Sequence, residues 1–193
     1  METVDVAVIG LGPGGEHVAN TLAERGLSVL GIERQLVGGE CPYWGCIPTK
    51  MMVRAAYSLA EARRVDGLAG HVAGVTPDWG QVAARIRREA TDSWDDRVAA
   101  KRFTGKGGIF VRGEGRIVSP TEVAVGDTRY AVRTGIVVAT GSKAAVPPVP
   151  GLSDVDYWTN RHAVETEELP RSLVVLGGGA IGCELGQVFA RFG

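Results

Sequence analysis

Two of the three cysteines lie in one short segment, separated by four residues. Cys41 and Cys46 fall within residues 38–50, which read GGECPYWGCIPTK. On a regular α-helix, residues five apart have Cα atoms about 8 to 9 Å from each other, whereas a disulfide needs roughly 4.4–6.8 Å. If the two cysteines pair, this segment cannot be helical throughout, and the glycines and proline around them suit a loop or a distorted first turn.

The cysteine pair can serve three purposes. As a structural crosslink it would close a very small ring, worth roughly 2 kcal/mol. As a metal site it offers two thiolates, without a second Cys or Cys/His pair at ligand spacing. As a redox pair it has suitable surroundings, because Pro48 fits the opening turn of a helix predicted over residues 47–64, and a helix N-terminus stabilises a thiolate. The local residues favour the redox reading and leave the other two open.

Composition narrows the class of protein. The 193 residues are 45% hydrophobic and 22% charged, which suits one globular domain and the start of a second. A net charge of −1 argues against nucleic-acid or polybasic membrane partners. We expect no signal peptide ahead of the first strand and find no apolar run long enough to span a bilayer, so a cytoplasmic protein is predicted.

The N-terminal segment carries the full pattern of a dinucleotide-binding βαβ unit. Residues 4–9 form an apolar run of the buried parallel-strand type. They lead into GLGPGG at residues 10–15, a helical pattern to about Arg25, and a second strand at 27–32. Glu33 follows where an acid that binds the adenosine ribose is expected.

The glycines of this unit have separate predicted roles. Gly10 permits the tight turn, Gly12 lets a pyrophosphate approach the helix N-terminus, and Gly15 lets the helix pack on the strand. The residues expected to hold the first cofactor here are Gly10, Gly12, Pro13, Gly14, Gly15, Glu33 and Arg34.

This unit followed by GGECPYWGCIPTK resembles the class I pyridine nucleotide-disulfide oxidoreductases, a family that includes dihydrolipoamide dehydrogenase, glutathione reductase and mercuric reductase. The resemblance implies that the first dinucleotide is FAD and that Cys41 and Cys46 form a redox-active disulfide beside the flavin. It implies that Cys46 is the charge-transfer thiol and Cys41 the interchange thiol that meets the substrate. Lys50 matches the family lysine near flavin N5, and Gly39 and Glu40 are expected to border the cofactor.

The cysteine segment departs from the family pattern in two places. Family members usually read GGTC-x-N-x-GC, whereas here Glu40 replaces the Thr and Pro42, Tyr43 and Trp44 replace x-N-x. Since these positions border the thiols and the flavin, they bear on the substrate more than on the chemistry.

The middle of the chain predicts one long helix and then a run of short strands. Asp78 and Gln81 form a capping pattern for a helix over residues 78–101. Its apolar stripe comprises Val82, Ile86, Ala90, Trp94 and Val98, with the charged residues on a solvated face. Short β runs follow at 109–112, 116–118, 123–125, 130–132 and 136–139. They resemble the family's β-meander, and Ala139, Thr140 and Gly141 match its ATG turn against FAD.

A second glycine pattern lies near the C-terminal end. Residues 172–176 predict a buried strand that leads into Gly177, Gly179 and Gly182, again spaced G-x-G-x-x-G before a helix. In the family this opens the NAD(P) domain, and Glu184 matches the glutamate that pairs with the lysine at position 50.

The fold class expected is α/β: a Rossmann-like FAD-binding domain with a parallel sheet and a β-meander over residues 1–150, then a linker and the first strand and helix of a second Rossmann-like NAD(P) domain over 151–193. The resemblance covers somewhat under half of a family member, and none of His17, His71 and His162 matches the family's acid/base histidine. It implies FAD and NAD or NADP as cofactors, a small disulfide or dithiol substrate, and a homodimer in the full-length enzyme, with these 193 residues alone inactive. Two alternatives stay open: a non-catalytic flavin-binding fragment, and a flavin oxidase or metal-ion reductase that uses the same thiols.

Overall fold

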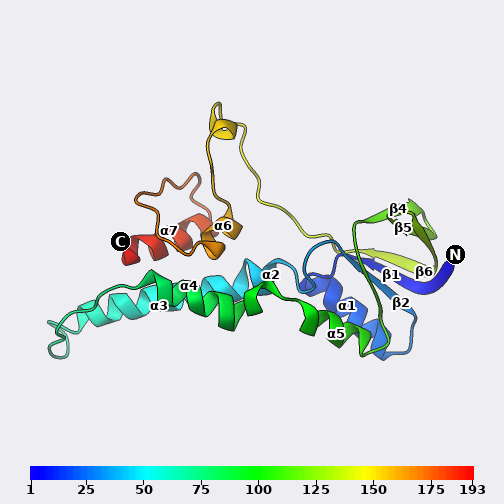
Figure 1. Cartoon of the computed structure of the whole chain (residues 1–193), viewed down its shortest axis with the longest axis horizontal. Coiled ribbons are helices and arrows are strands. Elements are labelled where there is room, and N and C mark those ends of the chain that lie inside the picture. Colours follow the sequence, from blue (N-terminus) through cyan, green and yellow to red (C-terminus); the bar gives the residue numbers. More distant parts are fainter. The chain divides into compact units, whose positions relative to one another are not determined.

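The computed structural model describes residues 1–193, which divide into two compact units (Figure 1). Unit 1 comprises residues 1–41 and 94–143, and unit 2 comprises residues 42–93 and 144–193. The functional boundary expected at residue 150 stays a prediction.

A single six-stranded sheet, in the order β3-β2-β1-β6-β5-β4, forms the centre of unit 1. The four strands β3, β2, β1 and β6 run parallel, and β5 and β4 continue from β6 as an antiparallel meander. The α/β class, the Rossmann-like sheet and the meander are therefore confirmed. The strands are β1 (Glu2–Ile9), β2 (Val29–Glu33), β3 (Ile109–Arg112), β4 (Gly115–Ser119), β5 (Glu122–Val125) and β6 (Thr128–Val138).

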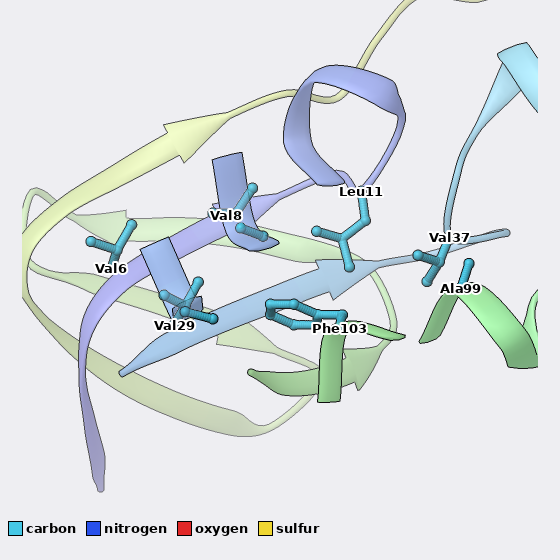
Figure 2. Packing of buried hydrophobic residues seen from close by; sticks show 9 residues of the cluster. Val6, Val8, Leu11, Val29, Val37, Ala99 and Phe103 are labelled. Carbon is cyan, nitrogen blue, oxygen red and sulfur yellow. The ribbon is translucent and has the colours of Figure 1, made fainter. Parts of the chain in front are cut away.

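Helices α1 (Pro13–Glu24) and α5 (Arg97–Thr104) contribute to the core on one face of the sheet. Val8 and Val29 point from the strands into this core, where Phe103 of α5 is fully buried (Figure 2). Phe103 leaves no room for a side chain on the strand beneath it, because a Cβ at Gly31 would lie 2.6 Å from its ring. A second core, which includes Leu30, fills the opposite face.

Strand β6 is one continuous strand, so the prediction of two short runs at 130–132 and 136–139 was wrong. It pairs with β1 along its length, and the register shifts between Val4 and Val6. Gly135 pairs with Val6 directly after the shift, at the gap that separated the two predicted runs. A bulge breaks the alternation of a strand without ending its pairing.

The long helix predicted over 78–101 is also wrong, although its start is confirmed. The Asp78 carboxylate accepts hydrogen bonds from the Gln81 N–H (3.3 Å) and from Gln81 Nε2 (3.0 Å), and α4 (Trp79–Arg85) begins there. The helix widens into a π-helical turn over Ile86–Ala90. There the Thr91 hydroxyl donates to the Ile86 carbonyl (3.2 Å), and Thr91 ends the helix.

Three residues in left-handed conformation separate the π-helical turn from α5. Asp92, Ser93 and Trp94 have φ of 48°, 56° and 58°. Since left-handed residues cannot continue a right-handed helix, the predicted i+4 stripe ends in this region. In α5, Val98 is 69% exposed whereas Phe103 is fully buried.

Unit 2 is helical. It holds α3 (Cys46–Arg64), α4, α6 (Asn160–Glu165), α7 (Ala180–Phe192) and the short turn η3 (Leu152–Asp154). Trp79 of α4 packs against Phe189 and Phe192 of α7, with ring centroids 5.1 and 5.3 Å apart, and its indole N–H donates to the Thr166 carbonyl. No helix in the structure is long and apolar enough to cross a membrane.

The buried strand predicted at 172–176 is wrong. These residues are all exposed and belong to no sheet, and Val174 is 83% exposed. A strand exists only where a neighbour satisfies its backbone groups, and no strand pairs with this segment. The helix expected after the second glycine pattern does form, as α7.

We predict that Phe103→Ala lowers the free energy of unfolding by about 3–5 kcal/mol, the usual cost of removing a buried Phe. Val98→Ala, on the exposed side of the same helix, should change it by less than about 0.5 kcal/mol. Urea denaturation of the two variants measures both values. Equal losses would contradict the observed placement of α5.

Candidate functional site

The first glycine turn joins the carboxyl end of β1 to α1. Gly10 has φ of 92°, a left-handed value that favours glycine. Gly12 is the N-cap residue of α1 with no side-chain hydrogen bond at the cap, and Pro13 follows in the first turn. The N-terminus of α1 is therefore bare backbone, which suits a phosphate.

Close backbone contacts fix the shape of this turn. A Cβ on Gly15 would lie 1.9 Å from the Gly10 carbonyl oxygen, so the helix can pack on the strand only with glycine there. A Cβ on Gly10 would lie 2.3 Å from the carbonyl oxygen of Ala139, whose N–H donates to the Ile9 carbonyl. The predicted ATG segment thus begins against the first glycine turn, with Thr140 and Gly141 exposed beyond it.

Glu33 ends β2 and is 9% exposed. Its carboxylate accepts the backbone N–H groups of Leu11 and Gln35, each at 2.8 Å. Because one of these bonds reaches the glycine turn, the carboxylate ties the ends of β1 and β2 together. A carboxylate has about four acceptor positions, so Glu33 keeps capacity for ribose hydroxyls. Arg34 beside it is exposed.

The segment that leads to the cysteines lies on the same turn. A Cβ on Gly39, whose φ is 63°, would lie 2.8 Å from the Gly12 Cα. The Gly38 N–H donates to the Leu11 carbonyl at 2.7 Å. The first contact leaves no room for a side chain on Gly39, so this glycine serves the turn as well as the cysteine segment.

Asp96 supports this segment and was missed in the sequence, where it was assigned to a solvated helix face. It is 8% exposed, accepts the Val37 N–H at 2.7 Å, and forms an ion pair with Arg112. A buried carboxylate needs such partners because desolvation disfavours its charge. The sequence carried no clear signal for this role, because the predicted helix ran through position 96 and the Asp96 carboxylate does not cap α5.

The two cysteines lie on different helices. Cys41 is in the short helix α2 (Glu40–Tyr43) and is partly buried, and the exposed Cys46 is the first residue of α3. The helical structure is interrupted at Trp44 and Gly45, as a disulfide between the cysteines would require. Whether they form that disulfide stays a prediction.

The start of α3 has no side-chain cap at Gly45, although the Thr49 hydroxyl donates to the Gly45 carbonyl at 2.9 Å. The helix N-terminus therefore presents unsatisfied N–H groups near Cys46, which favour a negative charge. Pro48 is buried in the first turn, and Lys50 is exposed one turn after Cys46.

The second glycine turn has the backbone conformation of the first. Gly177 has φ of 105°, and Gly179 caps α7 with φ −74° and ψ 169°, close to the −67° and −175° of Gly12. A Cβ on Gly182 would lie 3.1 Å from the Gly177 carbonyl oxygen, the counterpart of the contact at Gly15. Both turns can therefore present a helix N-terminus to a phosphate.

The structure shows no ion pair between Lys50 and Glu184, which the family resemblance predicts as partners. Lys50 and Glu184 are both exposed, and neither takes part in an ion pair. Cys183 is exposed, with its thiol 3.4 Å from the Gly178 carbonyl oxygen.

A parallel sheet, a glycine turn bare of side-chain caps and a buried acid at the end of β2 define a Rossmann-type dinucleotide-binding protein. Residues 4–193 match the pyridine nucleotide-disulphide oxidoreductase family. The chain belongs to this family, as its cysteine segment indicated, and the cofactors of the family are FAD and NAD(P)H.

Individual proteins that are similar to the chain are consistent with this family assignment. The chain is 35% identical to a mercuric reductase of Acidithiobacillus ferrooxidans, covering 100% of this chain and 36% of that protein. It is 36% identical to a dihydrolipoyl dehydrogenase of Thermus scotoductus, covering 100% of this chain and 41% of that protein. The solved Cu(II) complex of the HOCl-induced flavoprotein disulfide reductase RclA from Escherichia coli superposes with a TM-score of 0.83 at 26% identity, over 100% of this chain and 41% of that one. The chain thus spans well under half the length of these relatives.

Proposed function

We propose that this chain supplies the FAD-binding segment and the redox-active thiols of an NAD(P)H-dependent flavoprotein disulfide oxidoreductase. The observation that carries the proposal is the contact of Gly39 with Gly12. Through it, a dinucleotide-binding turn and the segment leading to Cys41 share one backbone surface.

The dinucleotide would be held by the chain's own backbone and one acid. The N-terminus of α1 at Gly12 binds the pyrophosphate, and Glu33 accepts hydrogen bonds from the adenosine ribose. By family resemblance, Lys50 would lie near the flavin ring, and the other residues expected to border FAD are Gly39, Glu40, Ala139, Thr140 and Gly141. Bound FAD would supply electron transfer between a pyridine nucleotide and a disulfide.

The thiol chemistry follows from Cys41 and Cys46. Two electrons and two protons reduce their disulfide to two thiols. The Cys41 thiolate then attacks a substrate disulfide and releases one thiol, and Cys46 closes the mixed disulfide to release the second. The N-terminus of α3 favours the negative charge of a Cys46 thiolate, and Lys50 paired with Glu184 would add a fixed charge beside the flavin.

The substrate, location and assembly follow from the resemblance. We propose a small disulfide or dithiol as substrate, NAD or NADP bound at Gly177, Gly179 and Gly182, and a cytoplasmic homodimer for the intact protein.

A metal-ion reductase is the second candidate, because mercuric reductases are among the relatives and one solved neighbour is a Cu(II) complex. The same exposed Cys46 could bind a soft metal ion. Anaerobic NAD(P)H oxidation with lipoamide, glutathione disulfide, Hg(II) or Cu(II) as acceptor separates the two candidates. Turnover with the metal ions alone would favour the second.

For the redox pair, we predict that mild reduction of the protein exposes two additional thiols. Cys183→Ser should leave this gain at two, whereas Cys41→Ser and Cys46→Ser should abolish the gain and, in the intact protein, the disulfide reductase activity. Thiol titration under denaturing conditions before and after reduction provides the counts. An unchanged thiol count in the wild-type protein would refute the redox assignment.

For the cofactor, we predict that Gly12→Ala weakens FAD binding roughly tenfold or more, equivalent to about 1.4 kcal/mol. Its φ of −67° and a distance of 4.0 Å to the nearest atom allow the fold to accept the methyl group, which would cover the helix N-terminus. Gly135→Ala, where a Cβ has open space, is the matched control. Titration of the apoprotein with FAD measures both affinities, and equal affinities would argue against binding at this turn.

A further inference from the structure

Trp44 lies between the two cysteines in the sequence and is 7% exposed. Three residues of α6 contact it. The Asn160 side-chain amide donates to the Trp44 carbonyl (3.1 Å), and the indole N–H donates to Glu165 Oε1 (2.5 Å). The Arg161 guanidinium carbon lies 4.0 Å from the ring centroid, in cation–π contact. The short helix α6 thus contacts the backbone carbonyl, the indole N–H and the ring face of Trp44.

Helix α6 is itself anchored within unit 2. Its first turn has a reciprocal cap, in which the Thr159 N–H donates to His162 Nδ1 at 3.0 Å. Ala163 and Val164 are buried on its inner side. Because the helix is fixed at its start and along one face, it is a firm support for Trp44.

We propose that α6 braces the segment between the cysteines, with Arg161 and Glu165 as positioning residues that act through Trp44. This assignment rests on the proposed function, because it concerns the ease with which Cys41 and Cys46 form their disulfide. Closing a disulfide requires both cysteines to reach a narrow range of Cα separation. A segment held at Trp44 has fewer conformations to lose on closure, so the brace favours the oxidised pair.

The relevant reaction is exchange with glutathione. The Cys41 and Cys46 thiols together lose two electrons and two protons, and one glutathione disulfide takes them up to become two glutathione thiols. The equilibrium constant of this exchange measures how strongly the α6 contacts favour the Cys41–Cys46 disulfide. The measurement needs no FAD, NAD(P)H or physiological substrate.

The test is to equilibrate the protein in glutathione buffers and to measure its oxidised fraction by acid quenching and thiol alkylation. Glu165→Ala removes the acceptor of the indole N–H and should reduce the equilibrium constant for disulfide formation about tenfold, which is about 30 mV for a two-electron couple. Trp44→Phe, which keeps the ring and loses the N–H, should shift it in the same direction. Glu165→Gln keeps an acceptor oxygen and should stay close to wild type.

Glu167→Ala is the matched control, because Glu167 lies two residues further on and pairs with Arg87 away from Trp44. It should leave the equilibrium unchanged. The assignment is overturned if Glu165→Ala only lowers the melting temperature and leaves the equilibrium at its wild-type value. The assignment is also wrong if Glu165→Gln shifts the equilibrium as much as Glu165→Ala, because the lost charge would then be responsible. It is wrong as well if Glu167→Ala shifts the equilibrium as much as Glu165→Ala. A wild-type pair that never oxidises would overturn the proposed function as well.

Discussion

The close approach of two glycine backbones is the constraint on which the candidate site depends. Gly39 lies against Gly12 so closely that a Cβ on Gly39 would be 2.8 Å from the Gly12 Cα. This contact brings the segment before Cys41 onto the N-terminus of α1, and the Gly38 N–H bond to the Leu11 carbonyl holds it there. A side chain on Gly39 would separate a phosphate-binding turn from the segment that leads to the thiols.

Two buried carboxylates stabilise this arrangement by accepting backbone N–H groups that have no strand or helix partner. Glu33 serves the glycine turn through Leu11, and Asp96 serves the following loop through Val37. Burying a charge is costly unless hydrogen bonds or an ion pair compensate it. Both acids have such compensation, with Arg112 added at Asp96. In this way the sheet of unit 1 positions loops that have no regular structure of their own.

The break after α4 has a comparable role. The left-handed residues at 92–94 end one helix and allow another to begin directly after Asp96. With the break, α5 buries Phe103 over the sheet, and Asp96 reaches Val37. A continuous helix would have kept the stripe of Val82 and Ile86 running through Val98, which is instead exposed. The local cost of a left-handed backbone is therefore offset by a core contact and a buried hydrogen bond.

The sequence by itself determined the features that depend on neighbours in the chain. These are the βαβ unit with its glycine spacing, the helix predicted over 47–64 that begins one residue earlier at Cys46, and the cap at Asp78. Local periodicity, turn chemistry and capping act over a few residues, so they can be read without a fold. Tertiary structure alone decided the bond from Val37 to Asp96, 59 positions apart, and that from Trp44 to Glu165, 121 apart. It also left residues 172–176 outside any sheet, although their apolar run predicts a strand. The physical reason is the same in each case: a buried carboxylate, an indole N–H and a strand edge all need partners, and only the folded chain supplies or withholds them.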